Sequence, residues 1–303
     1  PRDRLSMAFL KEREKGRTIP GPYGDVVHLD IRHLGEKGIS EKLPFARELA
    51  KNYIGIDPVY EPIPVRPVVH YMMGGIDTDI DGATELPGVY AAGETASVSI
   101  NGGNRLGSNS LPELLVFGAR AGRSAAKFAK ENLDLHTTAL VRQADDEQER
   151  ISKNFIRKQG GTVRIASLRQ EMMDIMENSA GIFRDESTLK DACNKLADLK
   201  GRFSNILIED RSLTFNTELT SALELENMLD LARTITHSAL ERRESRGAHQ
   251  RTDFPDRDDE KFLKSSLSYW TGEEPRIGHR EVKITKWPPG ERVYGTPAET
   301  KNE

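Results

Sequence analysis

The sequence has little of several features that mark common classes of protein. It holds one cysteine, Cys193, among 303 residues, so no disulfide can form within the chain. No apolar run approaches the roughly eighteen residues that a transmembrane helix needs, and the first residues do not resemble a signal peptide. Basic residues are not in excess, because the formal net charge is -4. We therefore expect a soluble chain from a reducing compartment, with no membrane span and no nucleic-acid partner.

The motif Gly-x-Gly-x-x-Gly, whose tight turn receives the pyrophosphate of a dinucleotide, is absent as well. The chain starts with Pro1 rather than with methionine, and its hydrophobic share of 36% is low beside 30% charged residues. These features predict more than one folded unit and a chain cut from a longer polypeptide.

What the sequence does contain is a group of three glycine-spaced segments. They are residues 70–76, 91–94 and 101–111, with the sequences HYMMGGI, AAGE and NGGNRLGSNSL. Glycines let the backbone approach a ligand closely. A His, a Glu, an Arg and the start of a helix, in this order, therefore indicate a binding site.

The last segment leads into a predicted helix from Leu111 to about Lys130. We expect Ser110 to cap this helix, with Glu113 completing a capping box. The helix dipole then points back at Asn104 and Arg105, where an anion or an anionic flavin ring would bind.

Glu94 ends a predicted buried strand over residues 87–94, where a carboxylate can accept hydrogen bonds from a ribose or ribityl diol. Taken alone, it is more typical of a surface turn. His70 and Arg105 together suit a small dicarboxylate, although each alone is more often structural. No local pattern marks Arg2.

The rest of the chain predicts mainly helices. Prolines at 58, 62, 64 and 67 force extended backbone and indicate a crossing between domains. Apolar spacing predicts helices over residues 3–15, 43–53, 163–177, 189–203 and 218–243, the last three with stripes typical of a bundle core. Alternation predicts strands over residues 24–31 and 281–287, and residues 253–261 form an expected charged loop.

Six motifs in order resemble the flavoprotein subunit of fumarate reductase and succinate dehydrogenase. They are RD at 2–3, EPIPV at 61–65, HYMMGGI at 70–76, AGE at 92–94, NRLGSNSL at 104–111 and ESRGAH at 244–249. L-aspartate oxidases are similar in the central motifs. The stretch from GDVV at 24–27 to LGEK at 34–37, with VKIT at 282–285 and RVYG at 292–295, resembles the bacterial quinol:fumarate reductase branch in particular.

The resemblance implies an α+β fragment with four parts. Residues 1–66 would end a capping domain that covers the substrate, and residues 67–132 would be the C-terminal part of an FAD-binding α/β domain. Residues 133–250 would form a helical bundle domain. Residues 251–303 would form a small C-terminal region with short strands and a tail.

The resemblance also implies the chemistry. A hydride would pass between flavin N5 and the dicarboxylate, fumarate or succinate, while Arg2 transfers the proton and His70 and Arg105 hold the substrate. No metal ligand is expected. The residues expected at FAD are Glu94, Ser110, Leu111, Tyr71 and Asn104.

By the same resemblance, an iron-sulfur subunit seated on membrane anchor subunits would exchange electrons with this flavoprotein in anaerobic respiration. The chain would be peripheral, at the cytoplasmic face of the inner membrane. The histidine that links FAD covalently would lie in a missing N-terminal half, so we expect this C-terminal half alone to be inactive. Alternatives are a fragment of a succinate dehydrogenase or L-aspartate oxidase flavoprotein, or a non-catalytic interaction module.

Two positions depart from the family pattern. Asn101 stands where the family usually has His, which removes an imidazole from the expected substrate site. Arg120 follows an alanine where relatives more often place Arg directly after Gly118, and we assign it no role.

Overall fold

The computed structural model describes residues 2–22, 24–133 and 137–290, and the side chains of Arg2 and Asp3 lie outside this description. The fold is α+β, as the sequence predicts, with long helices and sheets of two short strands. The chain forms two compact units, and residues 246–250 belong to the first although they follow most of the second. Unit 1 is Pro1–Asp134 with Arg246–Gln250, and unit 2 is Leu135–Ser245 with Arg251–Glu303.

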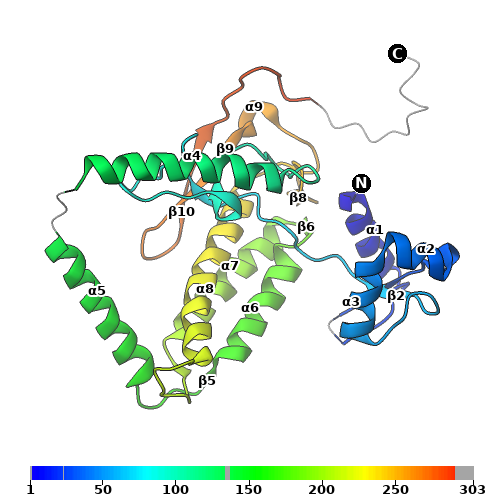
Figure 1. Cartoon of the computed structure of the whole chain (residues 1–303), viewed down its shortest axis with the longest axis horizontal. Coiled ribbons are helices and arrows are strands. Elements are labelled where there is room, and N and C mark those ends of the chain that lie inside the picture. The colour runs from blue at the N-terminus through cyan, green and yellow to red at the C-terminus, as the bar shows by residue number, and fades with distance from the viewer. Residues whose placement is uncertain (1, 23, 134–136, 291–303) are drawn as a thin grey trace. The chain divides into compact units, whose positions relative to one another are not determined.

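The first part of unit 1 combines three helices with a two-stranded sheet (Figure 1). Its elements are α1 (Arg2–Glu14), β1 (Val27–Leu29), the 3-10 turn η1 (Arg32–Leu34), α2 (Gly35–Lys42), α3 (Pro44–Ile54) and β2 (Ile63–Val65). The strands pair antiparallel, with Pro64 opposite His28. A proline cannot donate to a ladder, and it fits here because a sheet of two strands has only edges.

The expected helices over residues 3–15 and 43–53 agree with α1 and α3, but α2 was not predicted. Its eight residues contain two glycines and bury only Ile39, so they carry little periodic signal. The strand expected over residues 24–31 shortens to Val27–Leu29, because only three residue pairs join it to β2.

The second part of unit 1 carries the glycine-spaced segments. Its elements are β3 (Ile76–Asp77), the 3-10 turn η2 (Gly93–Thr95), β4 (Ala96–Ser97) and the long helix α4 (Ser110–Glu131). Strands β3 and β4 pair in parallel. The strand predicted over residues 87–94 is wrong. Tyr90 is bridged there to Ala83, and the flanking bonds from Thr84 N to Val89 O and from Ala91 N to Gly82 O limit the pairing to residues 89–91, so it does not extend over the predicted strand.

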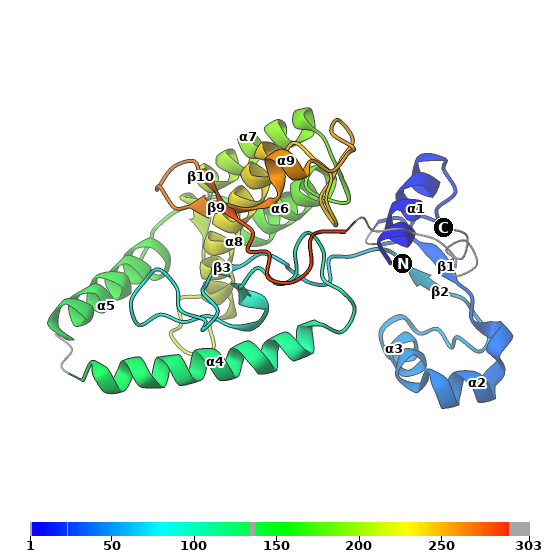
Figure 2. The same ribbon diagram turned by 90° about the horizontal axis from the view of Figure 1, so that it is seen from above.

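Unit 2 is built on three long helices, α6, α7 and α8, which lie side by side in Figures 1 and 2. The helices are α5 (Thr137–Ile151), the π-helix η3 (Ser152–Ile156), α6 (Ile165–Ser179), α7 (Glu186–Phe203), α8 (Thr217–Glu241) and α9 (Asp259–Phe262). The strands are β5 (Val163–Arg164), β6 (Phe183–Arg184), β7 (Ile206–Leu207), β8 (Gln250–Arg251, whose first residue belongs to unit 1), β9 (Lys264–Tyr269) and β10 (Arg276–Glu281). The helices predicted from the apolar stripes are confirmed within two residues at each end, except that α7 begins three residues earlier, at Glu186.

The core of unit 2 lies between these helices, as the stripes predict. Asp185 and Asn216 cap α7 and α8, accepting hydrogen bonds from the backbone N–H of Thr188 at 3.0 Å and of Leu219 at 2.7 Å. The buried cluster contains Phe155, Ile165, Leu168, Met172, Leu196, Leu199, Phe203, Ile206, Ile208, Ala222, Leu225, Leu229 and Ala232.

The C-terminal strand prediction is wrong in position. The paired strands are β9 and β10, joined by six residue pairs, and β10 ends at Glu281, where the predicted strand was to begin. The turn between β9 and β10, in which the Thr271 hydroxyl donates to Glu274 O at 2.7 Å, sets the register of this pair. No described strand pairs with residues 282–287. The expected charged loop over residues 253–261 contains the start of α9. Residues 291–303, the expected tail, lie outside the described residues.

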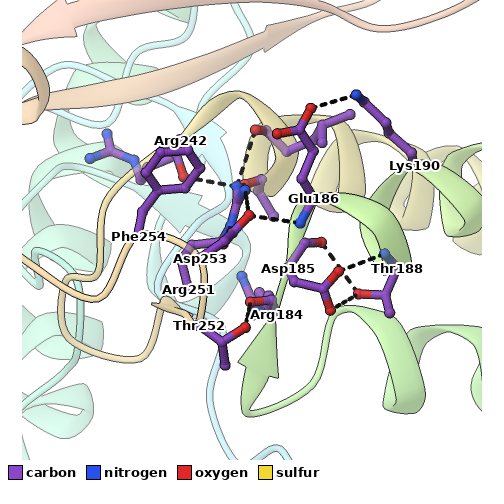
Figure 3. A network of polar contacts seen from close by, with 12 residues as sticks. Arg184, Asp185, Glu186, Thr188, Lys190, Arg242, Arg251, Thr252, Asp253 and Phe254 are labelled. Carbon is purple, nitrogen blue, oxygen red and sulfur yellow. Dashed lines mark hydrogen bonds and ion pairs between the residues drawn. The ribbon is translucent and has the colours of Figure 1, made fainter.

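The C-terminal end of α8 is capped by the buried side chain of Arg251 (Figure 3). Its guanidinium donates to the carbonyl oxygens of Ala239, Leu240 and Arg242, at 3.0, 3.2 and 3.2 Å. The last carbonyls of a helix lack partners within the helix and carry partial negative charge, so a cation stabilises them.

Candidate functional site

Tyr71, Asn101 and Glu113 bring three segments of unit 1 together. The Tyr71 hydroxyl and the Asn101 amide both donate to Glu113 Oε2, each at 2.9 Å. Glu113 lies in the first turn of α4, and only 4% of its surface is exposed. A single buried carboxylate thus joins the segment after the prolines, the glycine-rich loop and the helix.

Arg105 lies on the face of the Tyr71 ring, with the central guanidinium carbon 4.5 Å from the ring centroid. One terminal nitrogen donates to Leu106 O at 3.0 Å, and the buried Nε has no acceptor among the residues that the structure describes. The ring attracts the cation without using its N–H groups. Arg105 therefore keeps donors for a ligand such as a carboxylate.

The pKa of Tyr71 is raised above its usual value, first by burial and then by the hydrogen bond to Glu113. Both causes disfavour a negative phenolate, since burial penalises charge and Glu113 is an anion. Tyr71 is therefore a protonated donor at neutral pH.

Glu94 is in η2 and is exposed, and its Oε1 accepts a hydrogen bond from Met72 N at 2.8 Å. This bond holds the backbone next to Tyr71. No described residue donates to the other carboxylate oxygen, Oε2. Glu94 can thus fix the segment with one oxygen and accept a ligand hydroxyl with the other.

The capping box predicted at the start of α4 is wrong. Asn109, not Ser110, precedes the helix, and no side chain caps it. Glu113 binds Tyr71 and Asn101 instead of turning back to the cap, because a buried carboxylate needs several donors at once. The first backbone N–H groups of α4, at Ser110 and Leu111, therefore remain open to a ligand.

The remaining predicted residues are less defined by contacts. His70 is exposed and forms no hydrogen bond with any described residue, and Asn104 is half-buried. Arg2 begins α1, but its side chain lies outside the described residues. The structure thus brings Tyr71 together with Arg105 by direct contact, and with Glu94 through Met72.

The segment 246–250, which includes most of the ESRGAH motif, contacts the glycine-rich loop, and the sequence did not predict this contact. Ala248 N donates to Gly103 O at 2.8 Å, directly before Asn104 and Arg105. Gly247 has a φ of +59°, and a Cβ there would lie 2.3 Å from Gly103 C. The glycine in the motif was the available signal, but about 140 residues separate it from its partner in the sequence.

Arg120, to which we assigned no role, holds a loop against α4. Its Nε donates to Ile80 O at 2.7 Å, and its Nη2 pairs with Asp81 at 2.8 Å. In the described part of the chain, no three His, Cys, Asp or Glu side chains are grouped to bind a metal ion. Nor is any described helix both long and apolar enough to cross a membrane.

Two models of known protein families match parts of this chain. Residues 1–111 match the family model described as FAD binding domain, which places this part of the chain in the class of FAD-binding proteins. Residues 169–294 match the model described as fumarate reductase flavoprotein C-term.

Individual relatives narrow the class. The fumarate reductase flavoprotein subunit of Mycobacterium tuberculosis is 58% identical over 97% of this chain and 51% of its own length. The mitochondrial succinate dehydrogenase flavoprotein subunit of Oryza sativa is 36% identical over 97% of this chain and 49% of its own.

Among solved structures, the FrdA chain of Escherichia coli quinol fumarate reductase has a TM-score of 0.92 and 46% identity, covering 98% of this chain and 51% of that one. The chain belongs to the fumarate reductase and succinate dehydrogenase flavoprotein family. It spans about half the length of the curated relatives it matches.

Proposed function

We propose that this chain supplies the substrate side and the isoalloxazine side of a flavoprotein that interconverts fumarate and succinate. The observation that carries the proposal is the position of Arg105, held on the Tyr71 ring with unpaired donors. A guanidinium with open N–H groups is the group best suited to bind a carboxylate.

The described residues fit FAD. Glu94 has one carboxylate oxygen without a donor, and the N–H groups at the start of α4 have no side-chain cap. An acceptor for ribityl or ribose hydroxyls and a positive helix end for a reduced flavin are the two features that FAD needs here. Glu94, Ser110, Leu111, Tyr71 and Asn104 would hold it, and FAD when bound supplies the hydride chemistry.

The protein side chains divide the remaining work. His70 and Arg105 bind the two carboxylates of the substrate and orient it. Arg2 carries the proton to or from the substrate carbon. This is a demanding role for an arginine, because its guanidinium holds its proton so strongly.

We assign the four-part division of the chain, with boundaries near residues 66, 132 and 250, as part of this proposal. The histidine that bonds FAD covalently lies in a polypeptide outside these 303 residues. Val68, Val69, Leu106 and Leu111 lie close in sequence to Tyr71, Arg105 and Ser110 and are 77%, 83%, 65% and 65% exposed. Exposed apolar side chains beside binding segments suit a surface that another segment or a ligand covers.

Fumarate reductase is favoured over succinate dehydrogenase by sequence identity. Fumarate reductase flavoprotein subunits from several bacteria are 46–58% identical to this chain. The succinate dehydrogenase flavoprotein subunits of Oryza sativa and Rickettsia bellii are each 36% identical. One similar solved structure is quinol-fumarate reductase with menaquinol molecules. We infer an iron-sulfur subunit and membrane anchor subunits as partners, with the flavoprotein peripheral at the cytoplasmic face of the membrane.

The test compares the purified 303-residue chain with a flavoprotein that contains the rest of the polypeptide. Flavin absorbance and the oxidation of reduced benzyl viologen by fumarate are measured for both. We expect FAD and activity only in the longer protein, with activity lost on Arg105→Met and kept on Arg120→Met. Activity of the 303-residue chain without added protein, or an inactive longer protein, would overturn the proposal.

A further inference from the structure

Glu113 is an unusual residue for its position. Glu113 is the only buried side chain among the charged side chains of unit 1 that the structure describes. It forms no salt bridge with a described residue. Burying a carboxylate without a cation is costly, and an uncharged side chain of similar size would avoid that cost. The acid therefore needs a reason beyond packing.

Its surroundings compensate the charge through hydrogen bonds and a helix dipole. Glu113 accepts from Tyr71 and Asn101 at 2.9 Å each, and it lies in the first turn of α4, where the dipole is positive. Each donor belongs to a segment that carries a proposed substrate residue. Tyr71 follows His70 directly, and Asn101 lies in the loop that leads to Arg105.

The Tyr71 ring lies between the buried acid and Arg105. The guanidinium is 4.5 Å from the ring centroid, and the ring hydroxyl donates to Glu113. A hydrogen bond to an anion makes the phenol ring richer in electrons, which strengthens its attraction for a cation on its face. A direct salt bridge would instead occupy the N–H groups that a substrate carboxylate needs.

We propose that Glu113 is a positioning residue for Arg105. Through Tyr71 and Asn101 it fixes the guanidinium at the substrate site while leaving its donors free for a carboxylate. This inference rests on the proposed function of the site. It concerns the affinity for the dicarboxylate and not the proton or hydride transfer.

The experiment uses the longer flavoprotein with bound FAD and four variants. They are Glu113→Gln, Tyr71→Phe, the double variant, and Glu131→Gln as the control, since Glu131 is an exposed acid at the other end of α4. We expect each single change at the site to raise KM for fumarate about tenfold, while kcat changes less than about twofold. The dissociation constant of malonate, measured by the change in flavin absorbance, should rise by the same factor.

The double variant separates positioning from general damage. If Glu113 acts on Arg105 in part through Tyr71, the double variant should resemble Glu113→Gln, because Glu113→Gln already disrupts the contact that Tyr71→Phe removes. Independent effects that multiply would overturn the inference. An unchanged KM for fumarate in Tyr71→Phe would also overturn the inference. This variant keeps both the buried acid and the aromatic ring, so it tests the inference even if Glu113→Gln does not fold.

The two proposals fail differently. An unaltered longer flavoprotein that cannot reduce fumarate contradicts the proposed function. One that reduces fumarate normally while Glu113→Gln keeps the same KM contradicts only the role of Glu113.

Discussion

Asp253 binds Arg251 with both carboxylate oxygens, one to Nε and one to Nη2, each at 2.7 Å. The pair lies between two helix ends of unit 2 (Figure 3). Arg251 donates to the last carbonyls of α8, and Asp253 accepts from Glu186 N, at the start of α7, at 2.9 Å. The cation thus meets a negative helix end and the anion a positive one, which is the favourable arrangement of both charges.

Replacing Arg251 should be strongly destabilising. Arg251→Met leaves Asp253 without its cation and three helix carbonyls without a donor, and we expect a loss of about 3–5 kcal/mol in the free energy of unfolding. Urea unfolding followed by circular dichroism measures this. Arg142→Met is the matched control, because that arginine is exposed on α5 and should cost less than about 0.5 kcal/mol. Equal effects of the two changes would contradict the capping role.

The same pair predicts a dependence of stability on pH. Arg251 lowers the pKa of Asp253 from its ordinary value to about 2. A carboxyl group whose pKa is lower in the folded state stabilises that state above its unfolded pKa of about 4, and this contribution disappears as the pH falls toward 2. We expect Asp253→Asn to cost about 2 kcal/mol at pH 7, with the difference from the unaltered chain shrinking below about pH 4. A difference that stays constant down to pH 2 would show that the charge of Asp253 is not the cause.

Arg233, another buried arginine of unit 2, should have the opposite effect on stability when it is replaced. It is 8% exposed and lines a cavity of about 140 Å³ between α8 and the β9–β10 hairpin, and its Nε has no acceptor in the described part of the chain. Arg233→Met should leave the free energy of unfolding unchanged or raise it by up to about 2 kcal/mol, because it removes an unpaired buried charge. Urea unfolding checks this. A loss as large as that of Arg251→Met would contradict the argument.

Gly247 and Gly102 form a matched pair for testing the contact beside Arg105. Their φ angles are +59° and +58°, but a Cβ on Gly247 would strike Gly103, whereas one on Gly102 meets nothing within 4 Å. Gly102→Ala should cost about 1 kcal/mol, the strain of the backbone conformation alone. Gly247→Ala should cost at least about 3 kcal/mol in thermal or urea unfolding, because backbone must also move. Similar costs would mean that the segment 246–250 does not pack there.

Cys193 reports on the opening of unit 2. It is buried on α7, and burial raises the pKa of its thiol above the ordinary value. Both effects suppress the reactive thiolate, so we expect Ellman's reagent to react at least about a hundredfold more slowly than with the urea-unfolded chain. Because the chain has no other cysteine, the absorbance change reports this site alone. Fast reaction in native buffer would contradict the burial.

Elements whose signal is local were predictable from the sequence. The stripe of Leu225 and Leu229 on α8 and that of Leu196 and Leu199 on α7 repeat at steps of three and four, because one face of each helix is buried. The motifs around Glu94 and Arg105 also predicted the segments of the proposed site. By contrast, β10 was misplaced, because a strand of six residues is defined by its partner rather than by its own pattern.

The sequence by itself predicted the three long helices α6, α7 and α8 of unit 2, the family resemblance and the candidate ligand-binding residues, because each depends on residues close together in the chain. It did not predict α5. Only the tertiary structure decided what Glu113 does. The pattern around Ser110 predicts a capping box, but the side chain instead accepts hydrogen bonds from Tyr71 and Asn101, which lie 42 and 12 residues away in the sequence. A buried carboxylate takes whichever donors the fold brings to it, and local spacing does not encode which segments will meet.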